Sequence, residues 1–197
     1  PSLVPMGPGT QAKLLMTRDP DGHFVEVVEP PSIPETAAPE SANIVEVRVR
    51  LTVADVPTSV KLYEGLGLEL MNQSDFVDNA SVASAFGMPG SQFRFGMFKV
   101  PTTGLIFEVM DFRGVEGKVV RGNIQDPGST RIQLRVRDVD EAVAALTKAG
   151  GEVVSTGGQP LVIPAGQGQI KVAIVRDPDN LFLVLIGPAP AQAAAAR

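Results

Sequence analysis

The sequence has no cysteine and no tryptophan, and it has only one tyrosine and one histidine, His23. Without cysteine the chain can form no disulfide and offers no thiolate to a metal ion, which leaves its compartment open. We interpret His23 as a turn residue, because it directly follows Asp-Pro-Asp-Gly. A single histidine and no cysteine therefore leave covalent catalysis by a Ser/His/Asp or Cys/His set unsupported.

Basic charge and long apolar runs are also scarce. The 17 Lys and Arg residues are outnumbered by 22 Asp and Glu residues, which gives a formal net charge of −5. Nucleic-acid binding needs a basic surface, and single strands also need aromatic stacking platforms. No apolar run is long enough to span a membrane. We therefore expect a small-molecule ligand, no nucleic acid and no membrane, with the cytoplasm as the default location.

One phrase occurs twice in the chain. Residues 18–27 read RDPDGHFVEV and residues 176–185 read RDPDNLFLVL. In each copy Asp-Pro begins a turn, and Gly22 or Asn180 tolerates the positive φ that such a turn needs. Apolar residues flank both turns, so each phrase predicts a β-hairpin.

A second repeated unit reads strand, aspartate, helix. Apolar and polar residues alternate before Asp55 and again before Asp138, and each aspartate precedes a helical pattern. Aspartate is a good N-cap because its side chain accepts hydrogen bonds from the first free N–H groups of a helix. Adding the later hairpins predicts two βαβββ modules, at 43–112 and 130–187.

The rest of the chain is organised around these modules. We expect a complete two-module domain at 43–187, and a half-module before it that is the C-terminal hairpin of a preceding module. The predicted boundaries are 1–30 for this half-module, 31–42 for a Pro-rich linker and 188–197 for a flexible tail. Because the chain opens at Pro1 inside a module, we expect a fragment of a longer protein, or a processed precursor.

This arrangement resembles the vicinal oxygen chelate superfamily, which includes glyoxalase I, extradiol ring-cleaving dioxygenases and bleomycin resistance proteins. The resemblance rests on residues 48–55 (RVRLTVAD), on residues 61–70 (KLYEGLGLEL) and on the two Asp-Pro-Asp turns. It covers most of the chain. It implies an α+β fold in which paired βαβββ modules form a half-barrel cleft, with pairing either within the chain or in a homodimer.

Metal-using members of the family hold a divalent ion with His or Gln on the first strand of each module and Glu on the last. Counting back from the aspartate before each helix places the first-strand positions on Arg48 and Arg131, and the last-strand positions on Glu108 and Val184. Arginine stays protonated and only donates hydrogen bonds, so it cannot bind a cation. The resemblance thus implies no metal and no other cofactor in the complete domain.

A shift of two residues would keep the same strand faces and change these positions. It offers Glu46 or Arg50 on one first strand and Gln133 on the other. Glu46, Gln133 and Glu108 would then be an alternative set of oxygen ligands for a cation.

Arginines that alternate with aliphatic residues on both first strands indicate an anion-binding cleft, because the planar guanidinium makes paired contacts with carboxylates. Alternatively, these arginines pair with Glu108, Glu46 or Asp111 and fill the cleft with salt bridges. The ligand-binding candidates are Arg48, Arg50, Arg131, Gln133 and Glu108.

Glu26 aligns with the last-strand glutamate of the family in the incomplete N-terminal module. The resemblance implies a metal ligand here for Fe, Mn, Ni or Zn, with partners that precede Pro1. The alternative is a solvent-exposed glutamate on a strand. The connection at 72–92 is long and predicts a lid over the cleft, or else a surface loop with a short helix near 81–86.

Three functions are compatible with the resemblance. The first is a glyoxalase-like protein whose complete domain binds a small organic, anionic ligand without a catalytic metal. The second is a metal-dependent lyase or ring-cleaving dioxygenase with its site in the N-terminal domain, and the third is an antibiotic-sequestering binding protein. Whether the chain is an enzyme stays open at this point.

Overall fold

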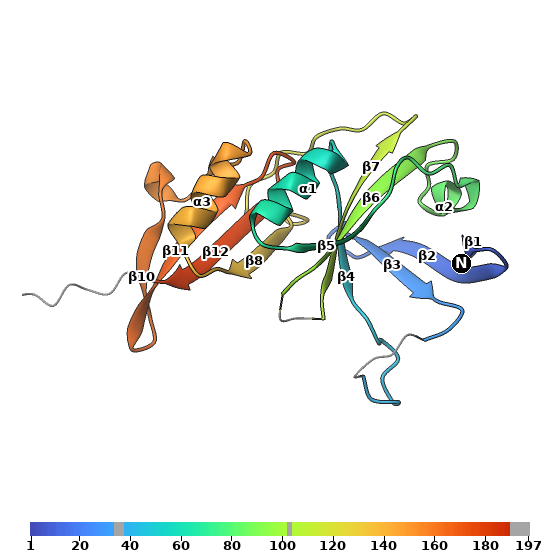
Figure 1. Ribbon diagram of the computed structural model, residues 1–197, viewed down its shortest axis with the longest axis horizontal. Helices are drawn as coiled ribbons and strands as arrows, with labels where there is room; N and C mark the ends of the chain where they lie inside the picture. The colour runs from blue at the N-terminus through green and yellow to red at the C-terminus, as the bar shows by residue number, and fades with distance from the viewer. Residues whose placement is uncertain (34–37, 102–103, 190–197) are drawn as a thin grey trace, which may run out of the picture. The chain divides into compact units, whose positions relative to one another are not determined.

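The computed structural model describes residues 1–33, 38–101 and 104–189, and Figure 1 traces its α+β architecture. The chain divides into two compact units, residues 1–118 (unit 1) and residues 119–197 (unit 2). Part of the predicted linker, at 34–37, and most of the predicted tail, at 190–197, lie outside the described residues. None of the described helices is long and apolar enough to cross a membrane.

Unit 1 begins with a three-stranded antiparallel sheet in the order β1-β2-β3. Its strands are β1 (Ser2–Gly7), β2 (Thr10–Arg18) and β3 (Phe24–Glu29). The β2–β3 turn is closed by Asp19, whose Oδ1 accepts hydrogen bonds from the N–H groups of Asp21 and His23. Gly22 has a φ of +92°, which glycine adopts without strain. The predicted hairpin is confirmed, and His23 lies in its turn.

The rest of unit 1 is a βαβββ module with one inserted helix. Its sheet has the order β4-β7-β6-β5, with β4 parallel to β7. The elements are β4 (Arg48–Thr52), α1 (Val56–Gly65), β5 (Glu69–Gln73), α2 (Ala80–Ala85), β6 (Gln92–Lys99) and β7 (Ile106–Arg113). Helix α2 is the short helix expected within 72–92.

Unit 2 repeats the pattern. Its sheet has the order β10-β11-β12-β8, β9 also pairs with β11, and β12 is parallel to β8. The elements are β8 (Arg131–Arg135), α3 (Val139–Lys148), β9 (Glu152–Val153), the short 3₁₀ helix η1 (Thr156–Gly158), β10 (Leu161–Ala165), β11 (Gly168–Arg176) and β12 (Phe182–Pro188). Pro188, the first residue of the predicted tail, is the last residue of β12 and pairs with Ile170 of β11.

Each module packs its long helix on one face of its sheet. In unit 1 the ring of Tyr63 meets the rings of Phe98 and Phe107 edge-on, at centroid distances of 5.9 and 4.7 Å. Gly96 faces the same helix, and a Cβ there would lie 2.8 Å from a Val60 methyl carbon. In unit 2 Leu146 of α3 is fully buried. The face of each sheet that points away from its helix is not covered by that helix.

Both predicted N-caps are confirmed. Asp55 accepts a hydrogen bond from the N–H of Thr58, and Asp138 accepts from the N–H groups of Asp140 and Glu141. Hydrogen bonds from the Thr58 hydroxyl and N–H hold the pKa of Asp55 below its usual value.

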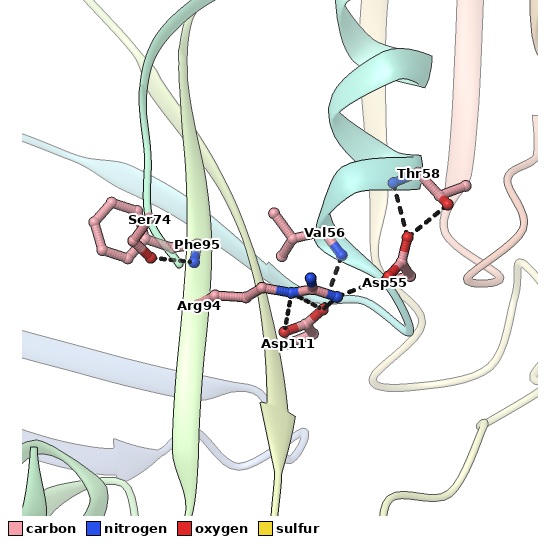
Figure 2. A network of polar contacts seen from close by, with 7 residues as sticks. All are labelled: Asp55, Val56, Thr58, Ser74, Arg94, Phe95 and Asp111. Atoms are coloured by element: carbon pink, nitrogen blue, oxygen red, sulfur yellow. Dashed lines mark hydrogen bonds and ion pairs between the residues drawn. The ribbon is translucent and has the colours of Figure 1, made fainter. Parts of the chain in front are cut away.

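A network of polar contacts around the buried Asp111 ties the start of α1 to the sheet in unit 1 (Figure 2). Asp111 of β7 is 3% exposed and accepts the N–H of Val56 at 2.9 Å. Arg94 of β6 donates from Nε to both Asp111 oxygens, at 3.0 and 2.8 Å, and from Nη2 to Asp55 at 2.7 Å. These bonds fix the helix on the sheet and so set which sheet face stays open.

Candidate functional site

The face of the β4-β7-β6-β5 sheet that points away from α1 carries a charged triad. Arg50 of β4 lies directly opposite Glu108 of β7 in the strand register. Its Nε and Nη2 donate to Glu108 Oε2 at 3.0 and 2.9 Å, and its Nη1 donates to Glu26 Oε2. Glu26 comes from β3, in the other sheet of unit 1. The triad of Glu26, Arg50 and Glu108 thus joins three predicted site residues.

Phe86 packs beside the triad and forms an aromatic cluster there. Its ring lies 5.5 Å from the guanidinium carbon of Arg50 and meets the rings of Phe93 and Phe112 edge-on. Phe86 also packs against the buried cluster of the first hairpin, which is formed by Val4, Ala12 and Leu14. The segment predicted as a lid therefore packs α2 and Phe86 onto the β1–β2 hairpin.

The charges around the triad do not balance. Arg48 pairs with Glu46 next to it, so three carboxylates face two guanidinium groups. Burial raises the pKa of Glu26, the positive charge of Arg50 opposes that rise, and the negative charge of Glu108 adds to it. Burial thus favours the protonated form of the Glu26 carboxyl.

This pKa shift predicts a pH dependence of stability. Above its ordinary value of 4.5, Glu26 binds more protons in the folded than in the unfolded protein, so stability must fall as pH rises through the raised pKa. Glu26→Gln removes this loss. In urea denaturation, we expect the variant to gain stability relative to the original protein as the pH rises above 4.5.

The matched control is Glu29→Gln on the same strand, where the exposed glutamate pairs with Lys13. The plot of stability against pH for this control should run nearly parallel to that of the original protein. A Glu26→Gln curve that also stays parallel would contradict the prediction.

The open sheet face of unit 2 is built differently. Arg131, Gln133 and Arg135 of β8 are exposed on the side away from α3. Within the part of the chain that the structure describes, none of these three side chains has an ion-pair or hydrogen-bond partner. Two guanidinium groups and one amide are therefore open to a ligand.

The neighbouring strands give this face an apolar floor. Phe182, Val184 and Ile186 of β12 lie opposite the three polar residues of β8 in register. Further along the sheet, the apolar residues that share this side are Ile174, Val172 and Ile170 of β11 and Leu161 and Ile163 of β10. No acidic residue of β8, β10, β11 or β12 lies on this side, and Glu152 of β9 lies there opposite Arg176. The face is therefore cationic over an apolar base at its β8 edge.

Sequence reasoning missed Arg176, which adds a third guanidinium to this face. It lies opposite Phe182 with its guanidinium carbon 4.8 Å from the ring centre, and it donates to the backbone oxygen of Gly122 at 3.1 Å. Arg18 lies over Phe24 in the same way, at 4.2 Å. The repeated spacing of arginine and phenylalanine in the two RDPD phrases was the available signal.

The strand registers show which predicted first-strand residues lie opposite the predicted last-strand residues. Arg50 lies opposite Glu108, and Gln133 lies opposite Val184. Arg48 and Arg131 lie opposite Ile106 and Phe182. The choice of Arg48 and Arg131 as the family's ligand positions stays a prediction, as does the alternative with a shift of two residues.

No family model and no curated protein matches this sequence. Among solved structures, a glyoxalase family protein from Bacillus cereus superposes with a TM-score of 0.65 at 18% identity, covering 78% of this chain and 100% of that one. The chain has the glyoxalase fold. Glyoxalase I from Zea mays superposes with a TM-score of 0.61 at 22% identity, covering 94% of this chain. This chain spans 57% of the maize protein, and at such identities the likeness establishes the fold alone.

The residues that the resemblance would place around a metal in unit 1 do not fit a divalent ion. The place between Glu26 and Glu108 holds a guanidinium, which repels a cation. Among the described residues, no group of three or more His, Asp or Glu side chains could hold a metal. In unit 2 the equivalent pair is Gln133 and Val184, which offers a single amide oxygen.

Proposed function

We propose that the chain binds a small organic anion on the open sheet face of unit 2 and uses no catalytic metal. The observation that carries this proposal is the row of Arg131, Gln133 and Arg135, whose side chains lack partners among the described residues and lie beside an apolar floor. A ligand with a carboxylate and an apolar body matches both parts of this face.

The two units differ in what their arginines can do. In unit 1, Arg48 and Arg50 are already paired with Glu46, Glu26 and Glu108. A ligand anion there would compete with carboxylates that are fixed to the protein. In unit 2, Arg131 and Arg135 have no carboxylate opposite them on the neighbouring strand β12, so a ligand anion gains the full charge-assisted interaction.

The two alternative functions have less support than the proposed one. A metal-dependent lyase or ring-cleaving dioxygenase centred on Glu26 would need this carboxylate free, and it is paired with Arg50. An antibiotic-sequestering protein would use a metal-free binding face, and it differs from our proposal only in the ligand. Elemental analysis of the intact protein purified without chelators addresses the first alternative, since stoichiometric Fe, Mn, Ni or Zn would favour it.

The test is a titration of the protein with benzoate, phenylacetate and 4-methylpentanoate, followed by NMR or calorimetry. We expect at least one of them to bind, and we expect Arg131→Gln with Arg135→Gln to weaken binding by about tenfold or more, because each charge-assisted bond contributes about 1.5–3 kcal/mol. Binding should also weaken as salt is added.

The control is Lys148→Gln, which removes a positive charge from the last turn of α3, on the other side of the sheet. This variant should bind like the original protein. If Lys148→Gln weakens binding equally, the loss of binding reflects the net charge of the protein and not a specific site, which would contradict the proposal. The proposal would also be contradicted if none of the three anions binds.

A further inference from the structure

Two carboxylates from separate sheets of unit 1 converge on one cation. Glu26 Oε2 accepts from Nη1 of Arg50, and Glu108 Oε2 accepts from its Nη2 and Nε. The planar guanidinium of Arg50 thus donates hydrogen bonds to both carboxylates at once. Without it, two like charges would face one another on a surface where Glu108 is 4% exposed.

We infer that Arg50 is the residue that keeps a divalent metal out of unit 1. Its guanidinium is a cation and already occupies the position between Glu26 and Glu108. The glyoxalase fold leads one to expect a metal between the first and last strands, and the residues of this chain disagree with that expectation. The inference goes beyond the proposed function, which concerns unit 2.

The charge count supports this role for Arg50. With Arg50 present, the local sum of Glu26, Glu46, Glu108, Arg48 and Arg50 is −1 when all are ionised. Removing the guanidinium changes this sum to −2, which one divalent ion compensates. The carboxylate oxygens are hard ligands of the kind that Mn²⁺ accepts.

The position of Arg50 supports it as well. Arg50 lies directly opposite Glu108 on the neighbouring strand, so a shorter polar side chain at this position would also point toward both carboxylates. Glutamine would contribute an amide oxygen as a third ligand, whereas lysine would keep a positive charge there.

The experiment compares Arg50→Gln, Arg50→Lys and the original protein in calorimetric titrations with Mn²⁺ and Ni²⁺, and records thermal unfolding with and without each metal. We expect Arg50→Gln to bind about one equivalent and to unfold at a higher temperature when the metal is present. The original protein and Arg50→Lys should bind no stoichiometric metal and show no shift.

A triple variant that adds Glu26→Gln and Glu108→Gln to Arg50→Gln serves as the ligand control and should lose the binding. If Arg50→Gln is unfolded without metal, we expect Mn²⁺ to restore its folded circular dichroism spectrum. An Arg50→Gln protein that stays unfolded with metal, or that binds no more metal than the original, overturns the inference. So does stoichiometric metal in the original protein or in Arg50→Lys, or unchanged binding in the triple variant.

Discussion

Arg50→Met is expected to lower the free energy of unfolding of unit 1 by about 3–5 kcal/mol, measured by urea denaturation at neutral pH. Methionine keeps an unbranched apolar stem beside Phe86 but removes the cation that Glu26 and Glu108 share. Because Glu108 is buried, water cannot replace the lost interaction at its carboxylate. The two carboxylates also repel one another once the guanidinium is gone.

Two further variants separate charge from packing at this position. Arg48→Met, on the same strand and face, breaks an exposed pair with Glu46 and should cost no more than about 1 kcal/mol. Adding Glu26→Gln and Glu108→Gln to Arg50→Met should recover most of the lost stability, since it removes the unpaired charges. No recovery in this combination would mean that the packing of the arginine stem, and not its charge, stabilises unit 1.

Asp111→Ala is the second substitution with a large expected effect, again about 3–5 kcal/mol in urea denaturation. Asp111 accepts the first free N–H of α1 and pairs with Arg94, and both partners lose this acceptor together (Figure 2). Because the Arg94 side chain is only 21% exposed, water is poorly placed to replace Asp111 as its hydrogen-bond acceptor.

Asp55→Ala is the matched control, because Asp55 caps the same helix and also binds Arg94, but from an exposed position. It should cost about 1 kcal/mol, as the loss of an N-cap usually does. A double-mutant cycle between Arg94 and Asp111 should give a coupling of about 1 kcal/mol or more. Equal losses from Asp55→Ala and Asp111→Ala would contradict the special role of the buried carboxylate.

The sequence predicted elements well where the signals are local. Asp55 and Asp138 cap helices as expected, because an N-cap interacts with N–H groups two or three residues away. The hairpins at 18–27 and 176–185 formed for the same reason, since Asp-Pro and a left-handed residue close a turn by themselves. The pairing of modules 43–112 and 130–187 into one domain stays a prediction.

The candidate site was harder to predict. The choice between Arg48 and Arg50 depends on the register between β4 and β7, and a two-residue slip leaves the sequence pattern unchanged while it exchanges the residue that faces Glu108. The sequence also left open whether the arginines bind a ligand or pair with carboxylates. In unit 1 they are paired, whereas in unit 2 Arg131 and Arg135 have no partner within the described residues.

The sequence by itself determined the repeated βαβββ pattern, the helix starts, the hairpins and the absence of thiolate chemistry, because each depends on residue type or on neighbours a few positions away. Only the tertiary structure decided that Glu26, Arg50 and Glu108 meet, since these residues lie 24 and 58 positions apart. Contacts at such separations follow from sheet pairing and helix packing, and no local periodicity encodes them.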